Sequence, residues 1–191
     1  MPANEYHFIT TWHIPATPEE ISEILGDAAG LARWWPSVYL AVEVLQAGGL
    51  EGVGRVVDLY TKGWLPYTLR WQFTVTESDA PRGFRIEANG DFVGRGIWSL
   101  TPERAADDPM GPLTSVTYDW KILAEKGVLK TFSAVMKPIF GANHRWAMAR
   151  GEESLLLEVR RRNALDSAAR AAVPAPPAPT FPHNLRRRLP T

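Results

Sequence analysis

The side chains that could do acid–base or metal chemistry are few in this chain. It has no cysteine and four histidines, His7, His13, His144 and His183. The lack of cysteine removes disulfides, thiol nucleophiles and thiolate metal sites together. The histidines share no metal-binding spacing, and His7 and His13 fall on the polar side of an alternating segment, so no metal site is predicted. No nucleophile elbow or phosphate-binding loop is present, and no cofactor is predicted.

His144 is the one titratable residue that the apolar pattern places inward, at the centre of a helical stripe. Three roles fit such a histidine: a core residue hydrogen-bonded to the backbone, a polar anchor for an oxygen of a ligand, or a catalytic base. A catalytic base needs a second group to orient it, but the charged residues of the strands fall mostly on the polar side. His144 is therefore only a weak catalytic candidate, and no other catalytic residue is predicted.

The other conspicuous residues are aromatic. Two adjacent indoles precede a proline in Arg33-Trp34-Trp35-Pro36, and the chain has eight tryptophans in all. Such a chain either fills an unusually bulky core or walls a hollow one. A dry cavity of about 300 Å³ would cost roughly 7 kcal/mol, which is comparable with the whole stability of a domain. A hollow core is therefore expected to hold water or a ligand.

The elements that position these side chains follow from changes in the apolar period. Residues 6–14 alternate as a half-buried strand does, and two short helices follow, the second ending at Pro36. The period is then two as far as Lys126-Gly127, with short turns between strands, which predicts an antiparallel meander. From Val128 to Arg162 the spacing is helical, with a break expected near Pro138.

This order of elements predicts an α+β protein with a helix-grip fold. In this fold a curved antiparallel sheet of about seven strands wraps around a long C-terminal helix, and the two short helices after the first strand close one end. Residues 1–162 are expected to form this domain.

The remaining residues, 163–191, form an Ala/Pro-rich basic tail that cannot build a core, and we expect it to be disordered. Its Arg186, Arg187 and Arg188 are too few to make a persuasive membrane-binding patch, so a solubilising role is favoured over peripheral membrane contact. Phe181 and the prolines around it are an alternative docking peptide for another protein.

The overall composition excludes several kinds of partner. Lys plus Arg and Asp plus Glu are both 21 in 191 residues, so the charge does not point to nucleic acid. No run approaches the roughly 18 apolar residues of a membrane span, and the N-terminus lacks the pattern of a secretory signal. We expect a cytoplasmic protein without an integral membrane segment, and the oligomeric state stays open.

Several segments carry a resemblance to a known family. The segments Arg33-Trp34-Trp35-Pro36, 92–100, 114–120 and 143–148 resemble the polyketide cyclase/dehydrase and lipid-transport branch of the START/Bet v 1-like (SRPBCC) superfamily. The resemblance covers about residues 6–162. It implies a helix-grip fold with a deep pocket between sheet and helix, whereas members range from carriers to cyclases, so the fold alone does not give the function.

The aromatic strand faces and the helical stripe together predict the wall of that pocket. Its expected ligand-binding residues are Trp34, Trp35, Tyr67, Trp71, Phe92, Trp98, Tyr118, Trp120, Phe132, Met136, Phe140, His144 and Met148. Because Trp34 and Trp35 stand where a helix-grip pocket would open, at least one of them is expected at its rim.

The predicted function is the binding or carriage of a hydrophobic small molecule, aromatic, polyketide-like or lipid-like. Two alternatives remain open. One is an aromatase/cyclase or dehydratase that uses the same pocket, where positioning a reactive chain does much of the work. The other is a protein-interaction module whose pocket is vestigial.

Overall fold

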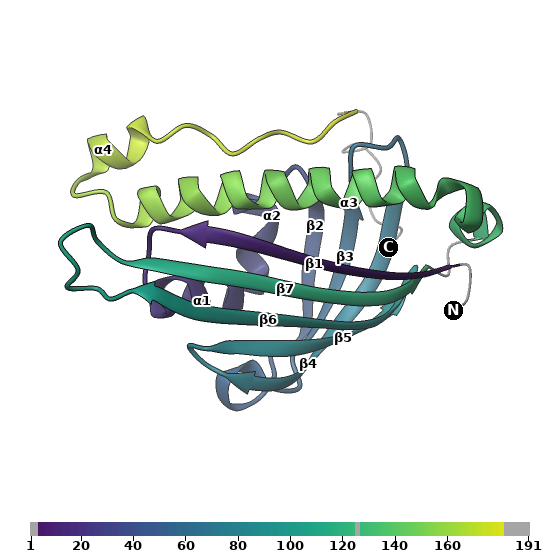
Figure 1. Ribbon diagram of the computed structural model, residues 1–191, viewed down its shortest axis with the longest axis horizontal. Helices are drawn as coiled ribbons and strands as arrows, with labels where there is room; N and C mark the ends of the chain where they lie inside the picture. The colour runs from purple at the N-terminus through teal and green to yellow at the C-terminus, as the bar shows by residue number, and fades with distance from the viewer. Residues whose placement is uncertain (1–3, 125–126, 182–191) are drawn as a thin grey trace.

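Seven strands form one curved antiparallel sheet, so the predicted fold class is confirmed (Figure 1). The computed structural model describes residues 4–124 and 127–181, with side chains described for all of these except 127–136. The strands lie side by side in the order β1-β7-β6-β5-β4-β3-β2. Their bounds are Glu5–Ile14 (β1), Tyr39–Gln46 (β2), Val56–Lys62 (β3), Thr68–Asp79 (β4), Gly83–Gly90 (β5), Phe92–Arg104 (β6) and Leu113–Ala124 (β7).

The short helices after β1 and the long C-terminal helix stand where the change of period predicted them, whereas η2 and α4 were not predicted. The bounds are Pro18–Gly26 (α1), Ala28–Gly30 (η1), Leu31–Trp34 (α2), Leu50–Gly52 (η2), Gly127–Arg162 (α3) and Ser167–Ala172 (α4). Helix α1 begins with a reciprocal cap: the Thr17 hydroxyl accepts a hydrogen bond from the Glu20 amide, and the Glu20 carboxylate accepts one from the Thr17 amide. These two hydrogen bonds form a capping box, which satisfies amide groups left free at the start of a helix.

Helix α3 lies across the concave face of the sheet, and the core fills the space between them (Figure 1). The alternation along β7 explains why the core lies on this side of the sheet. Every second side chain is buried, namely Val116, Tyr118, Trp120 and Ile122, whereas the residues between them are more exposed. Because successive side chains of a strand point to opposite faces, one such strand supplies one apolar surface to the helix.

Helix α3 is one element of 36 residues, where the sequence predicts a break. Pro138 lies inside it. A proline removes one hydrogen bond and crowds the preceding turn, which bends a helix but need not end it. The first turns of α3 accordingly bend away from the straight remainder (Figure 1).

The segment after α3 has a defined structure as far as residue 181, although the sequence predicted a disordered tail. Helix α4 is capped by Asp166, whose carboxylate accepts a hydrogen bond from the Ala169 amide at 2.7 Å. The chain then runs back alongside α3 (Figure 1). Its backbone carbonyls bind side chains of the domain, so it needs no core of its own. The residues Arg186, Arg187 and Arg188 lie outside the described part of the chain.

Candidate functional site

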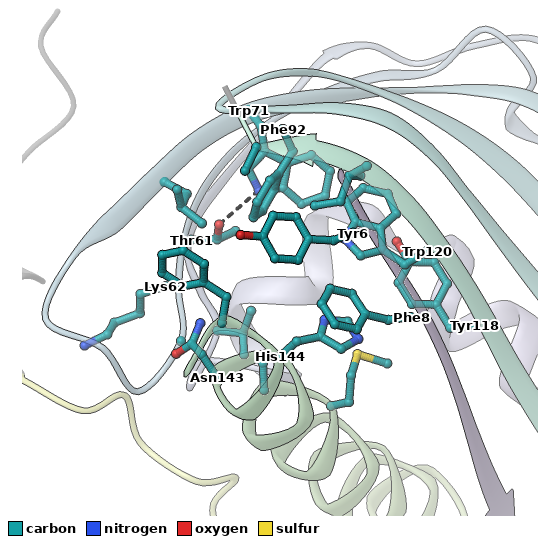
Figure 2. Close-up of a pocket in the computed structure, with 18 of the residues that line it drawn as sticks. Tyr6, Phe8, Thr61, Lys62, Trp71, Phe92, Tyr118, Trp120, Asn143 and His144 are labelled. Atoms are coloured by element: carbon teal, nitrogen blue, oxygen red, sulfur yellow. Dashed lines mark hydrogen bonds between the residues drawn. The ribbon is translucent and has the colours of Figure 1, made fainter. Parts of the chain in front are cut away.

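A cavity of about 120 Å³ lies between the sheet and α3 (Figure 2). Ten of the thirteen residues predicted for the pocket line it: Trp35, Tyr67, Trp71, Phe92, Trp98, Tyr118, Trp120, Phe140, His144 and Met148. The volume is well below the roughly 300–1,000 Å³ of ordinary ligand sites, and is near the size of a cavity that accepts one benzene ring. The core is therefore mostly filled, with room left for a single ring.

The predicted rim at Trp34 and Trp35 is wrong, because both indoles are buried. Trp34 has no exposed surface and does not line the cavity, and Trp35 is 3% exposed and forms part of the inner wall. The reason lies on α3, where Gly151 leaves the space that the Trp35 ring fills: a Cβ there would stand 2.3 Å from the ring. The helix thus closes over this corner. The side chains of Phe132 and Met136 lie outside the described part of the structure.

The aromatic rings of the wall pack against one another rather than facing an open space. Trp98 stacks on Tyr118 with ring centroids 4.2 Å apart, and the Trp71 indole N–H donates to the Thr61 hydroxyl at 3.0 Å. Tyr118 also occupies the place of a missing side chain, since a Cβ at Gly96 would lie 2.7 Å from its hydroxyl oxygen. These contacts explain why so aromatic a wall encloses so little volume.

His144 stacks on Phe8, with ring centroids 4.1 Å apart (Figure 2). Burial, and to a lesser degree the charge of Arg145, lowers the pKa of His144 to about 4. The imidazole is therefore neutral at physiological pH. Its Nε2 is buried and, among the described residues, has no hydrogen-bond partner. An unsatisfied buried polar atom is costly, so this nitrogen is well suited to bind an uncharged polar group of a ligand or a water molecule.

Lys62 is the one cationic side chain among the described residues that line the cavity. It ends β3 and is only 2% exposed. Figure 2 shows its ammonium directed away from the ring cluster. There it donates a hydrogen bond to the Thr180 carbonyl and lies 4.8 Å from the centre of the Phe181 ring. Burial lowers the pKa of Lys62.

Other lining residues were also missed. Tyr6 and Phe8 contribute from β1, and Tyr39, Thr61 and Asn143 contribute from β2, β3 and α3. Tyr6 and Phe8 had a readable signal, because they alternate in phase with Trp12. Burial raises the pKa of Tyr39, Tyr67 and Tyr118, so these hydroxyls stay protonated and uncharged at neutral pH.

The outer face of the sheet carries the remaining described histidines. His7 pairs with Asp119 at 2.9 Å and His13 with Glu103 at 3.1 Å, and all four side chains are partly or largely exposed. Within the described ranges, no group of three potential metal ligands comes together. In that same part of the chain, no helix is both long and apolar enough to cross a membrane.

The fold and the cavity define a class: a helix-grip domain with a small, aromatic, mostly uncharged cavity under its C-terminal helix. Residues 6–153 match the family model described as polyketide cyclase / dehydrase and lipid transport. The chain belongs to this family. No curated protein matches the chain closely enough to count as a relative.

Solved structures share the fold at low sequence identity. The Zhui aromatase/cyclase from Streptomyces sp. R1128 is 20% identical, with a TM-score of 0.60 over 86% of this chain and 98% of its own. TTHA0849 from Thermus thermophilus is 19% identical, with a TM-score of 0.59 over 80% and 99% of the two chains. A norcoclaurine synthase from Thalictrum flavum is 14% identical, with a TM-score of 0.50 over 81% and 96%. At these identities the likeness establishes the fold and no activity.

Proposed function

We propose that this protein binds an uncharged aromatic molecule of about one ring, with an oxygen of the ligand hydrogen-bonded to His144. The observation that carries the proposal is the cavity of about 120 Å³, walled by aromatic rings and by a neutral histidine whose Nε2 has no partner within the described part of the chain. If dry and empty, this volume would cost about 3 kcal/mol at roughly 24 cal/mol per Å³. A ligand that fills it recovers part of this free energy.

The small volume narrows the range of ligands. A lipid chain or an extended polyketide exceeds one ring, so a compact aromatic compound is favoured over both. A neutral ligand is favoured over an anion, because the Lys62 ammonium is turned away from the rings and bound to Thr180. Burying an unpaired carboxylate among the aromatic side chains would be strongly unfavourable.

Isothermal titration calorimetry with p-cresol tests the proposal, with benzoate as the charged counterpart. We expect p-cresol to bind and benzoate to bind at least about tenfold more weakly. Replacing Ala147, which lines the cavity, by phenylalanine should fill the space and abolish p-cresol binding. The matched control is Ala149→Phe on the exposed side of the same helix, which should leave binding unchanged. Absence of p-cresol binding to the wild-type chain would refute the proposal.

An aromatase/cyclase or dehydratase reaction in the same cavity is the alternative, since the family includes cyclases and dehydrases. The candidate base is His144, but a pKa of about 4 makes it a poor proton acceptor at neutral pH. No carboxylate is among the described residues that line the cavity. The cavity therefore favours binding over catalysis. An enzyme would incorporate deuterium at the methyl group of acetophenone faster than buffer does. A fall of at least about 100-fold in this rate in His144→Ala would favour the enzyme over a binding protein.

A further inference from the structure

The C-terminal segment 173–181 lies against the domain at two separate places. From α4 it runs back alongside α3 until it reaches the end of β3 (Figure 1). The family match ends at residue 153, so this segment lies outside the region that matches the family.

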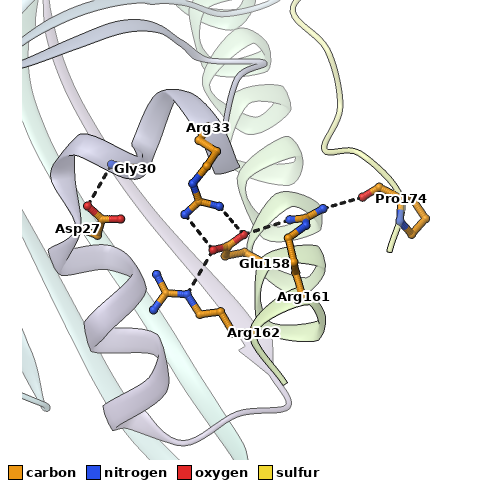
Figure 3. A network of polar contacts seen from close by, with 7 residues as sticks. All are labelled: Asp27, Gly30, Arg33, Glu158, Arg161, Arg162 and Pro174. Carbon is orange, nitrogen blue, oxygen red and sulfur yellow. Dashed lines mark hydrogen bonds and ion pairs between the residues drawn. The ribbon is translucent and has the colours of Figure 1, made fainter. Parts of the chain in front are cut away.

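The first contact holds the beginning of the segment. One terminal nitrogen of the Arg161 guanidinium donates a hydrogen bond to the Pro174 carbonyl at 2.9 Å, and the other donates to the Glu158 carboxylate (Figure 3). Pro174 is the first of four prolines within residues 174–179. Such a sequence favours an extended, semi-rigid conformation of about 3.1 Å per residue, which loses little entropy when both ends are fixed.

The second contact holds the end of the segment on the wall of the cavity. The Thr180 carbonyl accepts a hydrogen bond from the Lys62 ammonium, and its hydroxyl donates to the carbonyls of Gly63 and Trp64 at 3.3 and 3.4 Å. The Phe181 ring lies beside the same ammonium. These contacts bind Lys62 and Gly63 from outside the cavity, and both residues line it.

The same stretch of wall is held from α3 by Asn143. Its side-chain oxygen accepts a hydrogen bond from the Leu65 amide at 3.2 Å, and a Cβ at Gly63 would stand 2.2 Å from that oxygen. The wall at residues 62–65 therefore rests on Asn143 on one side and on Thr180 on the other. Only the Thr180 side belongs to a surface segment without a core of its own.

We propose that residues 173–181 form a strap that holds this wall closed, so that a ligand enters and leaves the cavity when the strap detaches from Lys62 and Gly63. This inference rests on the proposed function. The alternative route past Trp34 and Trp35 is blocked, because both indoles are buried and the Trp35 ring packs against Gly151 of α3. A few hydrogen bonds at the surface open locally far more often than packed core elements do, so among the described parts of the wall the strap is the one that we expect to release first.

The double variant T180V/F181A in the full-length chain tests the strap. It removes the hydroxyl donor and the ring beside Lys62, and leaves every residue that lines the cavity unchanged. Stopped-flow tryptophan fluorescence measures the association and dissociation rate constants of p-cresol. Both constants should rise about fivefold, as expected for the loss of one hydrogen bond and one ring contact. The ratio of the two constants, the Kd, should stay the same. The strap makes the same contacts with and without the ligand, so weakening them speeds entry and exit equally.

A matched control and a ligand-free measurement complete the experiment. Ser167→Ala, on exposed α4, should leave both rate constants unchanged. In the ligand-free protein, amide hydrogen exchange at residues 62–65 should be faster in T180V/F181A than in the wild type. Unchanged rate constants with p-cresol still bound would overturn the strap and leave the proposed function intact. If p-cresol does not bind at all, the proposed function fails, and unchanged hydrogen exchange would then overturn the strap as well.

Discussion

His144 illustrates how much the surroundings of a residue decide its chemistry. The sequence predicts that it points inward on the stripe of α3, and in the structure it is one of the residues that line the cavity. Its lowered pKa comes mainly from burial, and its ring stacks on Phe8 of β1, a contact between distant parts of the chain. A histidine that stays neutral offers one hydrogen-bond donor and one acceptor and no charge, which suits an uncharged ligand better than proton transfer.

The lowered pKa of His144 predicts a loss of stability in acid. Between the unfolded value of 6.5 and the folded value of about 4, the unfolded chain binds a proton that the folded chain excludes. The free energy of unfolding therefore keeps its full value above pH 6.5, where His144 is neutral in both states, and it decreases as the pH drops towards 4. We expect the wild type to lose about 2–3 kcal/mol more than His144→Phe between pH 7.5 and pH 4.5, as measured by urea unfolding. Equal losses in the two proteins would show that folding does not lower the pKa of His144.

At the scale of the element, α3 depends on where its glycines stand. Gly151 makes room for the Trp35 ring, whereas a Cβ at Gly141 would meet its nearest neighbour, the Arg145 guanidinium, at an ordinary 3.4 Å. Both positions look alike in the sequence, as glycines that weaken a helix. Only the sheet and the corner at α2 distinguish them.

The two glycines therefore predict opposite results for the same substitution. Gly151→Ala should destabilise the fold by about 1–3 kcal/mol, since the added methyl group overlaps a ring that cannot move away. Gly141→Ala should be neutral or stabilise by up to about 1 kcal/mol, because alanine is the better helix former. Urea unfolding of both variants checks the pair. Similar free energies of unfolding for the two would contradict the packing of Trp35 on α3.

At the scale of the whole molecule, Glu158 joins parts that are far apart in the chain (Figure 3). Arg33 of α2 binds it through two nitrogens at 2.9 and 3.0 Å, and Arg161 and Arg162 bind it at 3.0 and 3.2 Å. Arg161 also holds the strap at Pro174. Burial by itself would raise the pKa of Glu158, but the hydrogen bonds from these arginines outweigh it and lower the pKa.

Replacing Glu158 by glutamine should cost about 2 kcal/mol of stability at pH 7. The variant leaves three arginines around a neutral amide, and their partial exposure keeps the loss below the roughly 3–5 kcal/mol of a fully buried broken pair. The control is Glu153→Gln, which removes an exposed pair with Arg150 and should change stability by less than about 0.5 kcal/mol. Because the pKa of Glu158 is lower in the folded chain than in the unfolded chain, its charge stabilises the fold above the unfolded pKa. This stabilisation is lost as the pH falls through the folded pKa. The difference between E158Q and the wild type should therefore vanish in strong acid.

Much of the fold and part of the site were predictable from the sequence, because periodicity reports local geometry. A period of two gave the strands and the inward faces of Trp71, Trp98 and Trp120, and the period of 3.6 gave the inward stripe with His144. The break predicted at Pro138 is not found, and α3 continues through this residue. A helix packed along a sheet tolerates the one hydrogen bond that a proline removes.

The sequence by itself determined the order of the elements, the faces of the strands and the aromatic character of the core, since each depends on neighbours along the chain. The tertiary structure alone decided the size of the cavity, the burial of Trp34 and Trp35, the neutral state of His144 and the cover over Lys62. Each of these depends on atoms from segments that are distant in sequence, such as Gly151 facing Trp35 and Thr180 facing Lys62. Volume and desolvation are properties of such three-dimensional neighbours, and no periodicity along the chain encodes them.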